Sequence, residues 1–382
     1  MPGSAEVSAP ARPSWVVSPE VFDLTPTADE QALVAAAAEF AREVLRPAAQ
    51  AADEAAAAPP AVVAASRELG LDLLGVPTAL GGLGDERGVV GAVLVAEALA
   101  TGDPGLAVTA LAPGAVATAL SLWGSVAQQR RLRSWLDRAR GGAALALGEP
   151  TVLFDVHAPA TTARRRGEDL LLDGAKSLVP RAMDAEWFLV GAVLDGRPVL
   201  VLVDRDAPGV EVAPEPAMGV RGAGLGRLTL RGVTVPAGDL VGDPEGTAYA
   251  QCVRLSRLAW CALGVGTAQA VLDHVRPYVN ERLAFGEPIS HRQSVAFMVA
   301  DLAIELQAMR LMTYRAAALV ARGSDAAREI GLAHTLCAAK AMRIGLDGVQ
   351  LLGGHGYVKE HPVERWYRDL RALGVMEGGV LV

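Results

Sequence analysis

The chain has 382 residues, enough for two or three domains, and a formal net charge of −8 at pH 7. This acidic balance argues against a general nucleic-acid-binding protein. The three cysteines, Cys252, Cys261 and Cys337, have no short paired spacing, which excludes a disulfide framework and a cysteine zinc site. The six histidines show no zinc-type pairing either, so we predict no metal site.

No targeting or membrane segment is expected. The first 19 residues are rich in Pro, Ser and Ala and lack the continuous apolar core of a signal peptide. The most apolar region, residues 89–123, is too short between its interruptions to span a membrane. These interruptions are Glu97, Asp103, Pro104 and Pro113. We therefore expect a cytoplasmic protein, and the abundance of Ala, Val, Leu and Arg is typical of a GC-rich bacterial coding sequence.

The first part of the chain reads as helical. Residues 1–26 form a loose lead-in, and Thr27 followed by Glu30 is a capping-box pattern that begins a helix. Helical patterns continue over 61–69, 89–100 and 107–122, and a basic stretch over 128–139 predicts a surface helix. The prediction is an all-α domain over residues 27–142.

The hydrophobic pattern then changes to that of strands. Short apolar runs cover 170–172, 187–193 and 199–203, and Asp195-Gly196 is a turn signal between the last two. Apolar residues between 228 and 235 nearly alternate with polar ones. We predict a small antiparallel β domain over residues 143–243.

Long helical patterns return from Thr247 onward, over 249–275, 292–322 and 326–352. They predict a four-helix bundle over residues 244–382. The predicted fold class is therefore α+β and multidomain, with an N-terminal all-α domain, a middle antiparallel β domain and a C-terminal four-helix bundle.

The end of the last long helix carries the strongest functional signal. Ala338, Ala341, Leu346, Val349 and Leu352 recur at helical spacing before a glycine pair, 353–354. Glycine takes the left-handed conformation that ends many helices, and it lets a ligand approach the backbone closely.

Two further segments suit cofactor and proton chemistry. Glu377 lies between apolar Val375-Met376 and two glycines, and a loop carboxylate in such surroundings is suited to proton transfer near neutral pH. An arginine such as Arg282 can hold a pyrophosphate with two hydrogen bonds, and the ring of Phe285 can stack on a planar cofactor.

Together these segments closely resemble the acyl-CoA dehydrogenase family of flavoproteins. The segments that carry the resemblance are R-L-A-F-G-E-P-I (282–289), Q-L-L-G-G-H-G-Y (350–357), P-V-E-R-W-Y-R-D (362–369) and E-G-G (377–379). The order of helical domain, β domain and helical bundle is also that of the family. The resemblance begins near residue 28 and is strong from about residue 254.

The resemblance implies a function and a set of site residues. Glu377 would remove the α-proton of an acyl thioester while FAD takes the β-hydride, and Arg257 and Gly378 would lie beside the substrate. The FAD of a neighbouring subunit would be contacted by Arg282, Phe285, Gln293, Gln350, Gly353 and Gly354. The implied partners are an acyl thioester of CoA or of a carrier protein and an electron-accepting flavoprotein. A homodimer or homotetramer is expected, with a hetero-oligomer as the alternative.

The β domain departs from the family where it would face the flavin. The family's T-E-P-x-x-G-S-D reads G-E-P-T-V-L-F-D at 148–155, and N-G-x-K-x-W/Y-I-T reads D-G-A-K-S-L-V-P at 173–180. Hydroxyl or small residues are thus replaced by Gly148, Leu153-Phe154 and Pro180, and the aromatic ring by Leu178. Proline also lacks a backbone N–H. Outside the β domain, the threonine that follows E-G in the family is Gly379 here.

Three functions are compatible with C-terminal motifs that match the family and β-domain motifs that depart from it. The first is an FAD-dependent acyl-thioester α,β-dehydrogenase. The second is a subunit without its own flavin that completes the site of a related partner chain. The third is a flavin-independent enzyme that uses Glu377 for proton transfer, since a fold does not fix a function.

Overall fold

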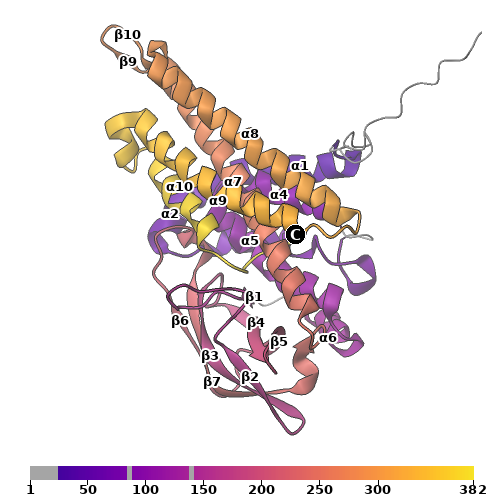
Figure 1. Ribbon diagram of the computed structural model, residues 1–382. Helices are drawn as coiled ribbons and strands as arrows, with labels where there is room; N and C mark the ends of the chain where they lie inside the picture. The colour runs from indigo at the N-terminus through magenta and orange to yellow at the C-terminus, as the bar shows by residue number, and fades with distance from the viewer. Residues whose placement is uncertain (1–24, 84–87, 137–141) are drawn as a thin grey trace, which may run out of the picture.

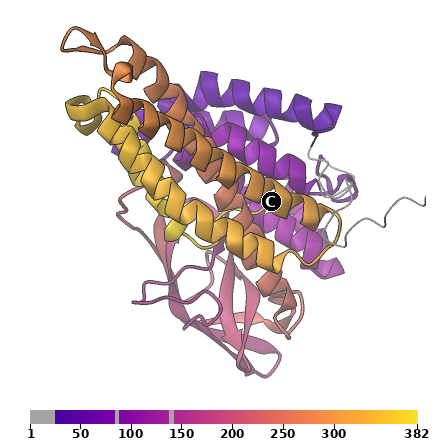
Figure 2. The same ribbon diagram turned by 45° about the horizontal axis from the view of Figure 1, so that its top comes forward.

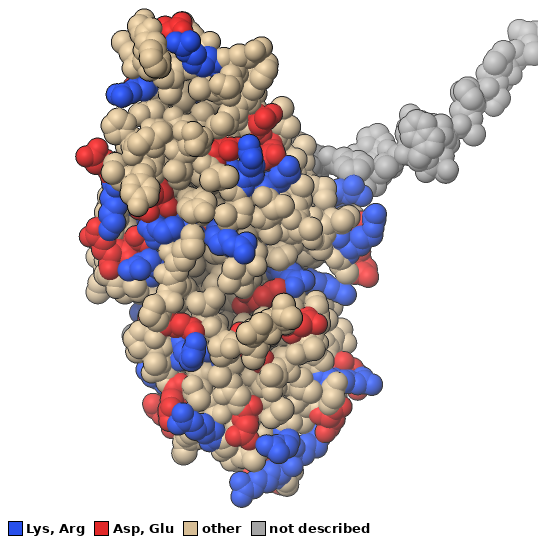
Figure 3. All heavy atoms as spheres, turned by 60° about the vertical axis from the view of Figure 1, so that its left-hand side comes forward, with Lys and Arg blue, Asp and Glu red and all other residues tan. Residues whose placement is uncertain are grey.

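The computed structural model describes residues 25–83, 88–136 and 142–382 (Figure 1). The helices from both ends of the chain pack together as one helical layer, and the β domain lies against one side of that layer (Figures 1 and 2). This arrangement confirms the predicted fold class. On the face shown in Figure 3, acidic and basic side chains are intermixed over the helical layer and the β domain.

The N-terminal part is helical, as predicted. Thr27 Oγ1 accepts the backbone N–H of Glu30, and the Glu30 carboxylate accepts the N–H of Thr27, which confirms the capping box. The first helix continues through a π-helical turn, Ala41–Leu45, into the second. The helices are α1 (Ala28–Phe40), α2 (Arg46–Ala55), α3 (Pro60–Glu68), α4 (Val89–Ala100), α5 (Pro104–Trp123) and α6 (Val126–Leu136).

α5 runs through Pro113, in agreement with the helical pattern predicted over 107–122. Proline leaves the carbonyl four residues earlier without its helical N–H donor. That carbonyl belongs to Thr109, and the Arg181 guanidinium donates to it at 3.5 Å. By length and hydropathy, α5 and the later helix α7 could each cross a membrane, but 83% of each apolar window is buried inside the protein. They are therefore core helices.

The β domain contains one large sheet, with the order β6-β7-β3-β2-β4-β5-β8 and with β1 beside β4. Most neighbouring strands are antiparallel, but β1 and β2 each run parallel to β4, which corrects the purely antiparallel prediction. Alternation of apolar residues indicates a half-buried strand without giving its direction. The strands are β1 (Gly142–Ala146), β2 (Thr162–Arg166), β3 (Asp169–Val179), β4 (Ala185–Leu194), β5 (Arg197–Asp204), β6 (Val210–Pro214), β7 (Gly226–Pro236) and β8 (Leu240–Val241). Asp195-Gly196 joins β4 to β5, as predicted.

The C-terminal part contains three long helices and a short one. They are α7 (Thr247–Glu281), α8 (Gln293–Ala321), α9 (Ala327–Leu352) and α10 (Val363–Leu370). A small hairpin of β9 (Leu283–Ala284) and β10 (Glu287–Pro288) joins α7 to α8. α4 from the N-terminal part packs against α7 and α8, so the bundle includes helices from both ends of the chain.

One residue of the predicted apolar stripe on α9 faces outward, since the side chain of Leu346 is 51% exposed. The buried face is instead built around Gly345 and Gly348, where the helix approaches its neighbours closely. A Cβ on Gly345 would lie 3.1 Å from the Cα of Tyr367, and one on Gly348 would lie 2.6 Å from Val271 Cγ1. Small residues therefore set which face of α9 is buried.

Candidate active site

The segment after α10 carries Glu377 into the junction between the helical layer and the sheet. Gly378 forms an antiparallel bridge with Ala146, the last residue of β1. The carbonyl of Gly378 accepts two hydrogen bonds from α7, from Ser256 Oγ at 3.0 Å and from Trp260 Nε1 at 2.8 Å. The backbone beside Glu377 is therefore fixed between α7 and the sheet.

Arg257 on α7 holds the Glu377 carboxylate. Its Nε lies 3.0 Å from Oε1 and 3.2 Å from Oε2, and its Nη2 also donates to Oε1. The side chains of Glu377 and Arg257 are 12% and 25% exposed. The sequence pointed to apolar surroundings for this carboxylate, but its closest neighbour is a guanidinium. The structure thus brings together Glu377, Arg257 and Gly378.

Chain neighbours of Glu377 and of Arg257 line two cavities. Val375 and Met376, which precede Glu377, line an apolar cavity of about 210 Å³ together with Leu178 of the β domain. Arg254 and Leu255, within one turn of Arg257 on α7, line a cavity of about 370 Å³. The loop between α8 and α9 closes this second cavity through residues 323–327.

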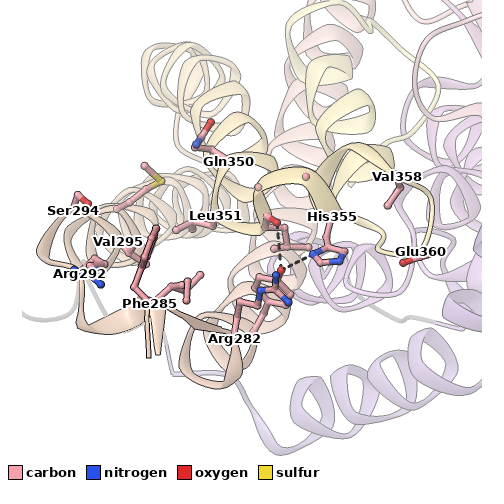
Figure 4. A pocket seen from close by; sticks show the side chains of 17 residues that line it. Arg282, Phe285, Arg292, Ser294, Val295, Gln350, Leu351, His355, Val358 and Glu360 are labelled. Carbon is pink, nitrogen blue, oxygen red and sulfur yellow. Dashed lines mark hydrogen bonds between the residues drawn. The ribbon is translucent and has the colours of Figure 1, made fainter. Parts of the chain in front are cut away.

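The residues predicted to contact a cofactor form a separate group around a cavity of about 830 Å³ (Figure 4). Five of the six line it: Arg282, Phe285, Gln350, Gly353 and Gly354. Gln293 is the first residue of α8 and is exposed, but its neighbours Ser294 and Val295 line the cavity in its place.

Phe285 presents an open aromatic ring in this cavity. Its side chain is 96% exposed, and its backbone adopts a left-handed φ of 56°, which is uncommon for a bulky residue. The Arg292 guanidinium lies 5.8 Å from the ring centroid, within cation–π range. Strain of this kind is associated with binding sites.

The glycine pair opens the opposite wall of the same cavity. Gly353 ends α9 with φ 58°, and a Cβ on Gly353 or Gly354 would meet no other atom within 4 Å. Behind the pair, the Tyr278 hydroxyl lies 3.0 Å from His355 Nδ1 and 3.4 Å from the Leu352 carbonyl. Sequence reasoning missed Tyr278, although its position one turn before Arg282 places it on the same side of α7.

The two groups lie far apart in one chain. Arg257 and Arg282 are 25 residues apart along α7 and its C-cap, which corresponds to about 37 Å at the helical rise. One extended cofactor cannot contact both groups of the same chain. Any site that uses both must combine two copies of this chain or this chain and a related one.

The departures in the β domain have structural counterparts. The Leu178 N–H donates to the Glu215 carboxylate at 2.7 Å, and the Ser177 hydroxyl donates to the same side chain. Burial raises the pKa of Glu215, but hydrogen bonds from Leu178 and Arg227 outweigh it and hold the pKa below its usual value. Leu153 is 95% exposed. The surface at Leu153 and Leu178, which the resemblance places toward a flavin ring, thus carries apolar side chains. The Leu178 N–H is already hydrogen-bonded to Glu215.

A buried ion pair lies next to these residues in the β domain. Lys176 Nζ lies 2.7 Å from Glu149 Oε1, with 0% and 2% of the side chains exposed. Glu149 also accepts the backbone N–H groups of Ala160 and Thr161, so it ties the segment after β1 to the start of β2. Burial lowers the pKa of the Lys176 ammonium to about 8, while Glu149 opposes this shift.

Comparisons with known proteins match this architecture. Family models of the N-terminal, middle and C-terminal domains of acyl-CoA dehydrogenases match residues 27–138, 144–233 and 246–379. The chain is 30% identical over 366 residues to a probable acyl-CoA dehydrogenase of Bacillus subtilis, with 94% of this chain and 96% of the relative covered. It is also 30% identical over 362 residues to the mitochondrial isobutyryl-CoA dehydrogenase of Dictyostelium discoideum, with 92% and 86% covered.

Solved structures of known proteins share this fold. Butyryl-CoA dehydrogenase from Megasphaera elsdenii superposes with a TM-score of 0.85 at 25% identity, with 94% of this chain and 96% of that chain covered. The family match and the relatives indicate an oxidoreductase that acts on CH–CH bonds. The chain belongs to the acyl-CoA dehydrogenase family.

The residues present fit the flavin dinucleotide that such a fold implies. The large cavity offers the Phe285 ring, the Arg282 guanidinium and an open glycine wall, which suit an aromatic ring and a pyrophosphate. The apolar cavity between Leu178 and Met376 suits a flat hydrophobic ring. The β-domain side therefore offers an apolar lining with Arg368 and Arg371 beside it, and the distant group offers an aromatic ring and a guanidinium.

Proposed function

We propose that this protein is an FAD-dependent α,β-dehydrogenase of acyl thioesters, carried by CoA or by a carrier protein, with Glu377 as the α-proton base. The Arg257–Glu377 pair is the observation that carries the proposal, because it holds a carboxylate directly after residues that line an apolar cavity, while Arg257 follows residues that line a second cavity. FAD, when bound, supplies the acceptor for the β-hydride. Cofactors of this kind perform the redox chemistry, and the protein supplies position and charge.

The residues of this chain have distinct tasks in the proposed reaction. One Glu377 oxygen takes the proton from the carbon next to the thioester carbonyl. Arg257 holds the carboxylate in place before the substrate arrives, and the fixed backbone at Gly378 keeps Glu377 at the junction. The thioester would enter through the cavity beside Arg254, one turn of α7 before Arg257. We also propose an electron-accepting flavoprotein as the redox partner.

The active unit would be at least a dimer. The separation along α7 means that Arg282, Phe285, Gln350, Gly353 and Gly354 serve the FAD of the neighbouring copy. The exposed side of α8 supports this arrangement, because Phe297, Ile304 and Leu311 recur every seven residues and are at least 57% exposed. An exposed apolar stripe of this kind is typical of a helix that packs against a partner. A homodimer or homotetramer satisfies both features.

A second candidate function rests on the β domain. The Leu178 N–H is already bonded to Glu215, and Pro180 has no N–H, so this side offers few donors to a flavin. The chain would then complete the FAD site of a related partner with Arg282 and Phe285, without binding a flavin in its own β domain. A hetero-oligomer would be the active unit.

The first experiment is the visible absorption spectrum of the purified chain after incubation with FAD and removal of excess cofactor. About one flavin per chain, together with turnover of an acyl thioester that is lost in Glu377→Gln, supports the dehydrogenase. A colourless chain that retains flavin only when it is co-expressed with a related chain supports the second candidate. An active Glu377→Gln variant would rule out the assigned base.

A further inference from the structure

His334 lies at the level of Arg257 because α7 and α9 run parallel in a fixed register. The thiols of Cys261 on α7 and Cys337 on α9 lie in one buried cluster and are close enough to shift each other's pKa. Farther along both helices, Gly348 packs on Val271, where an added Cβ would lie 2.6 Å from Cγ1. Arg257 lies about one turn before Cys261 on α7, and His334 lies about one turn before Cys337 on α9. The two side chains therefore face the same space between the helices.

The imidazole of His334 has one nitrogen without a partner. Its Nε2 is buried and has no hydrogen bond to any described residue. The backbone of Leu373 raises the pKa of the ring, which fits a hydrogen bond from the other nitrogen, Nδ1, to the Leu373 carbonyl. A neutral imidazole with its proton on Nδ1 carries a bare acceptor at Nε2. A buried acceptor without a donor is unfavourable, so its persistence calls for an explanation.

The charged groups around this imidazole belong to the proposed active site. Arg257 on α7 and Glu377 after α10 both act on it electrostatically, and the cysteine pair lies one turn away. Burial, followed by the positive charge of Arg257, lowers the pKa of His334. The neutral ring is therefore the form present near neutral pH, and a neutral ring can accept from a guanidinium.

The resting arrangement conflicts with the proposed reaction. Arg257 Nε and Nη2 both point at Glu377 and engage both carboxylate oxygens. Glu377 can take a proton from a substrate only with an oxygen that is turned toward that substrate. The guanidinium then needs another acceptor, because an unpaired cationic donor is costly when it is partly buried.

We propose that His334 is a positioning residue whose Nε2 accepts the Arg257 guanidinium when Glu377 turns to the substrate. This inference rests on the proposed role of Glu377. Arg257 would have two positions, one on the carboxylate and one on the imidazole. His334 would fix the second position and would exchange no proton with the substrate.

The first test uses the protein without cofactor or substrate. In Glu377→Leu the guanidinium has lost its carboxylate, so it should turn to His334 and donate to Nε2. The ¹⁵N resonance of His334 Nε2, assigned with the help of His334→Gln, should move upfield from its wild-type position. It should stay at the wild-type position in Arg257→Leu/Glu377→Leu, which has no guanidinium to donate. An unchanged resonance in Glu377→Leu would overturn the proposal.

The second test separates positioning from structure by steady-state kinetics. In His334→Leu we expect kcat to fall about tenfold to a hundredfold with an unchanged KM, because Arg257 stays on the base. His334→Gln keeps an oxygen acceptor and should restore most of the activity. Wild-type kcat in His334→Leu, or a Gln variant as slow as the Leu variant, would contradict the proposal. If Glu377→Gln were fully active, the proposed function itself would fail, whereas the resonance test would still decide the role of His334.

Discussion

Pro180 and Gly379 fit against each other across the junction between the β domain and the C-terminal segment. A Cβ on Gly379 would lie 2.8 Å from Pro180 Cγ, and Gly379 has a left-handed φ of +86°. Both positions are departures from the family pattern, in which each carries threonine. The two departures therefore compensate for each other, since the proline ring takes up space that a side chain on residue 379 would need.

Gly379→Ala should destabilise the protein by about 1–3 kcal/mol, because it adds a steric conflict to an unfavourable left-handed backbone. Urea unfolding of the variant measures this loss. Pro180→Ala/Gly379→Ala should lose less than the sum of the two single variants, because removing the ring relieves the conflict. Strict additivity would show that the two residues do not compensate for each other.

The buried pair Lys176–Glu149 should matter far more than an exposed pair of the same length. Lys176→Met leaves the Glu149 carboxylate buried without its cation and should cost about 3–5 kcal/mol. The matched control is Arg231→Met, which breaks the exposed 2.6 Å pair with Glu211 and should cost about 0–1 kcal/mol. Equal losses in the free energy of unfolding would contradict this account.

Asp103 should make stability depend on pH. Burial raises the pKa of Asp103 from 3.8 to about 6, although Arg365 lies 3.3 Å away and lowers it. The folded state then binds more protons than the unfolded state between these two values. The contribution of protonated Asp103 to the free energy of unfolding is therefore present below about pH 4 and is lost as the pH rises to about 6.

Asp103→Asn removes this titration while keeping an acceptor for the Leu106 N–H at the start of α5. Relative to that of wild type, the free energy of unfolding of the variant should increase by on the order of 1–3 kcal/mol as the pH rises from 4 to 7. Urea unfolding at several pH values measures the difference. A difference between variant and wild type that is the same at every pH would be inconsistent with a titrating Asp103.

Phe285→Ala should weaken FAD binding without affecting the fold. The ring is almost fully exposed and makes few contacts within its own chain, so its loss should change stability little. Loss of stacking should weaken FAD binding about fivefold or more. Fluorescence titration with FAD measures this, and Val126→Ala on the exposed side of α6 serves as the control. Unchanged affinity in Phe285→Ala would remove the ring from the site.

The sequence was informative where the physics is local. The capping box at Thr27, the turn at Asp195-Gly196 and the end of α9 at Gly353 each depend on one or two residues and their neighbours in the chain. Hydrophobic periodicity also predicted the long helices within a few residues, because each buries a continuous face.

The sequence was less informative where the outcome depends on tertiary contacts. The helical pattern over 107–122 predicted that α5 continues through Pro113, but not that Arg181, 68 residues later, donates to the carbonyl that the proline leaves free. The surroundings of Glu377 could not be read from Val375 and Met376, because the decisive neighbour, Arg257, lies 120 residues earlier. The separation of the two groups of site residues became visible only from their places along α7.

Anaerobic mixing of an acyl thioester with the FAD-loaded protein tests the central claim most directly. Flavin absorbance would be followed through a single turnover in wild type and in Glu377→Gln, with equal flavin content in both. If Glu377 is the α-proton base, the wild type loses its flavin band and the variant does so at least about a hundredfold more slowly. Bleaching of Glu377→Gln at the wild-type rate would contradict the account.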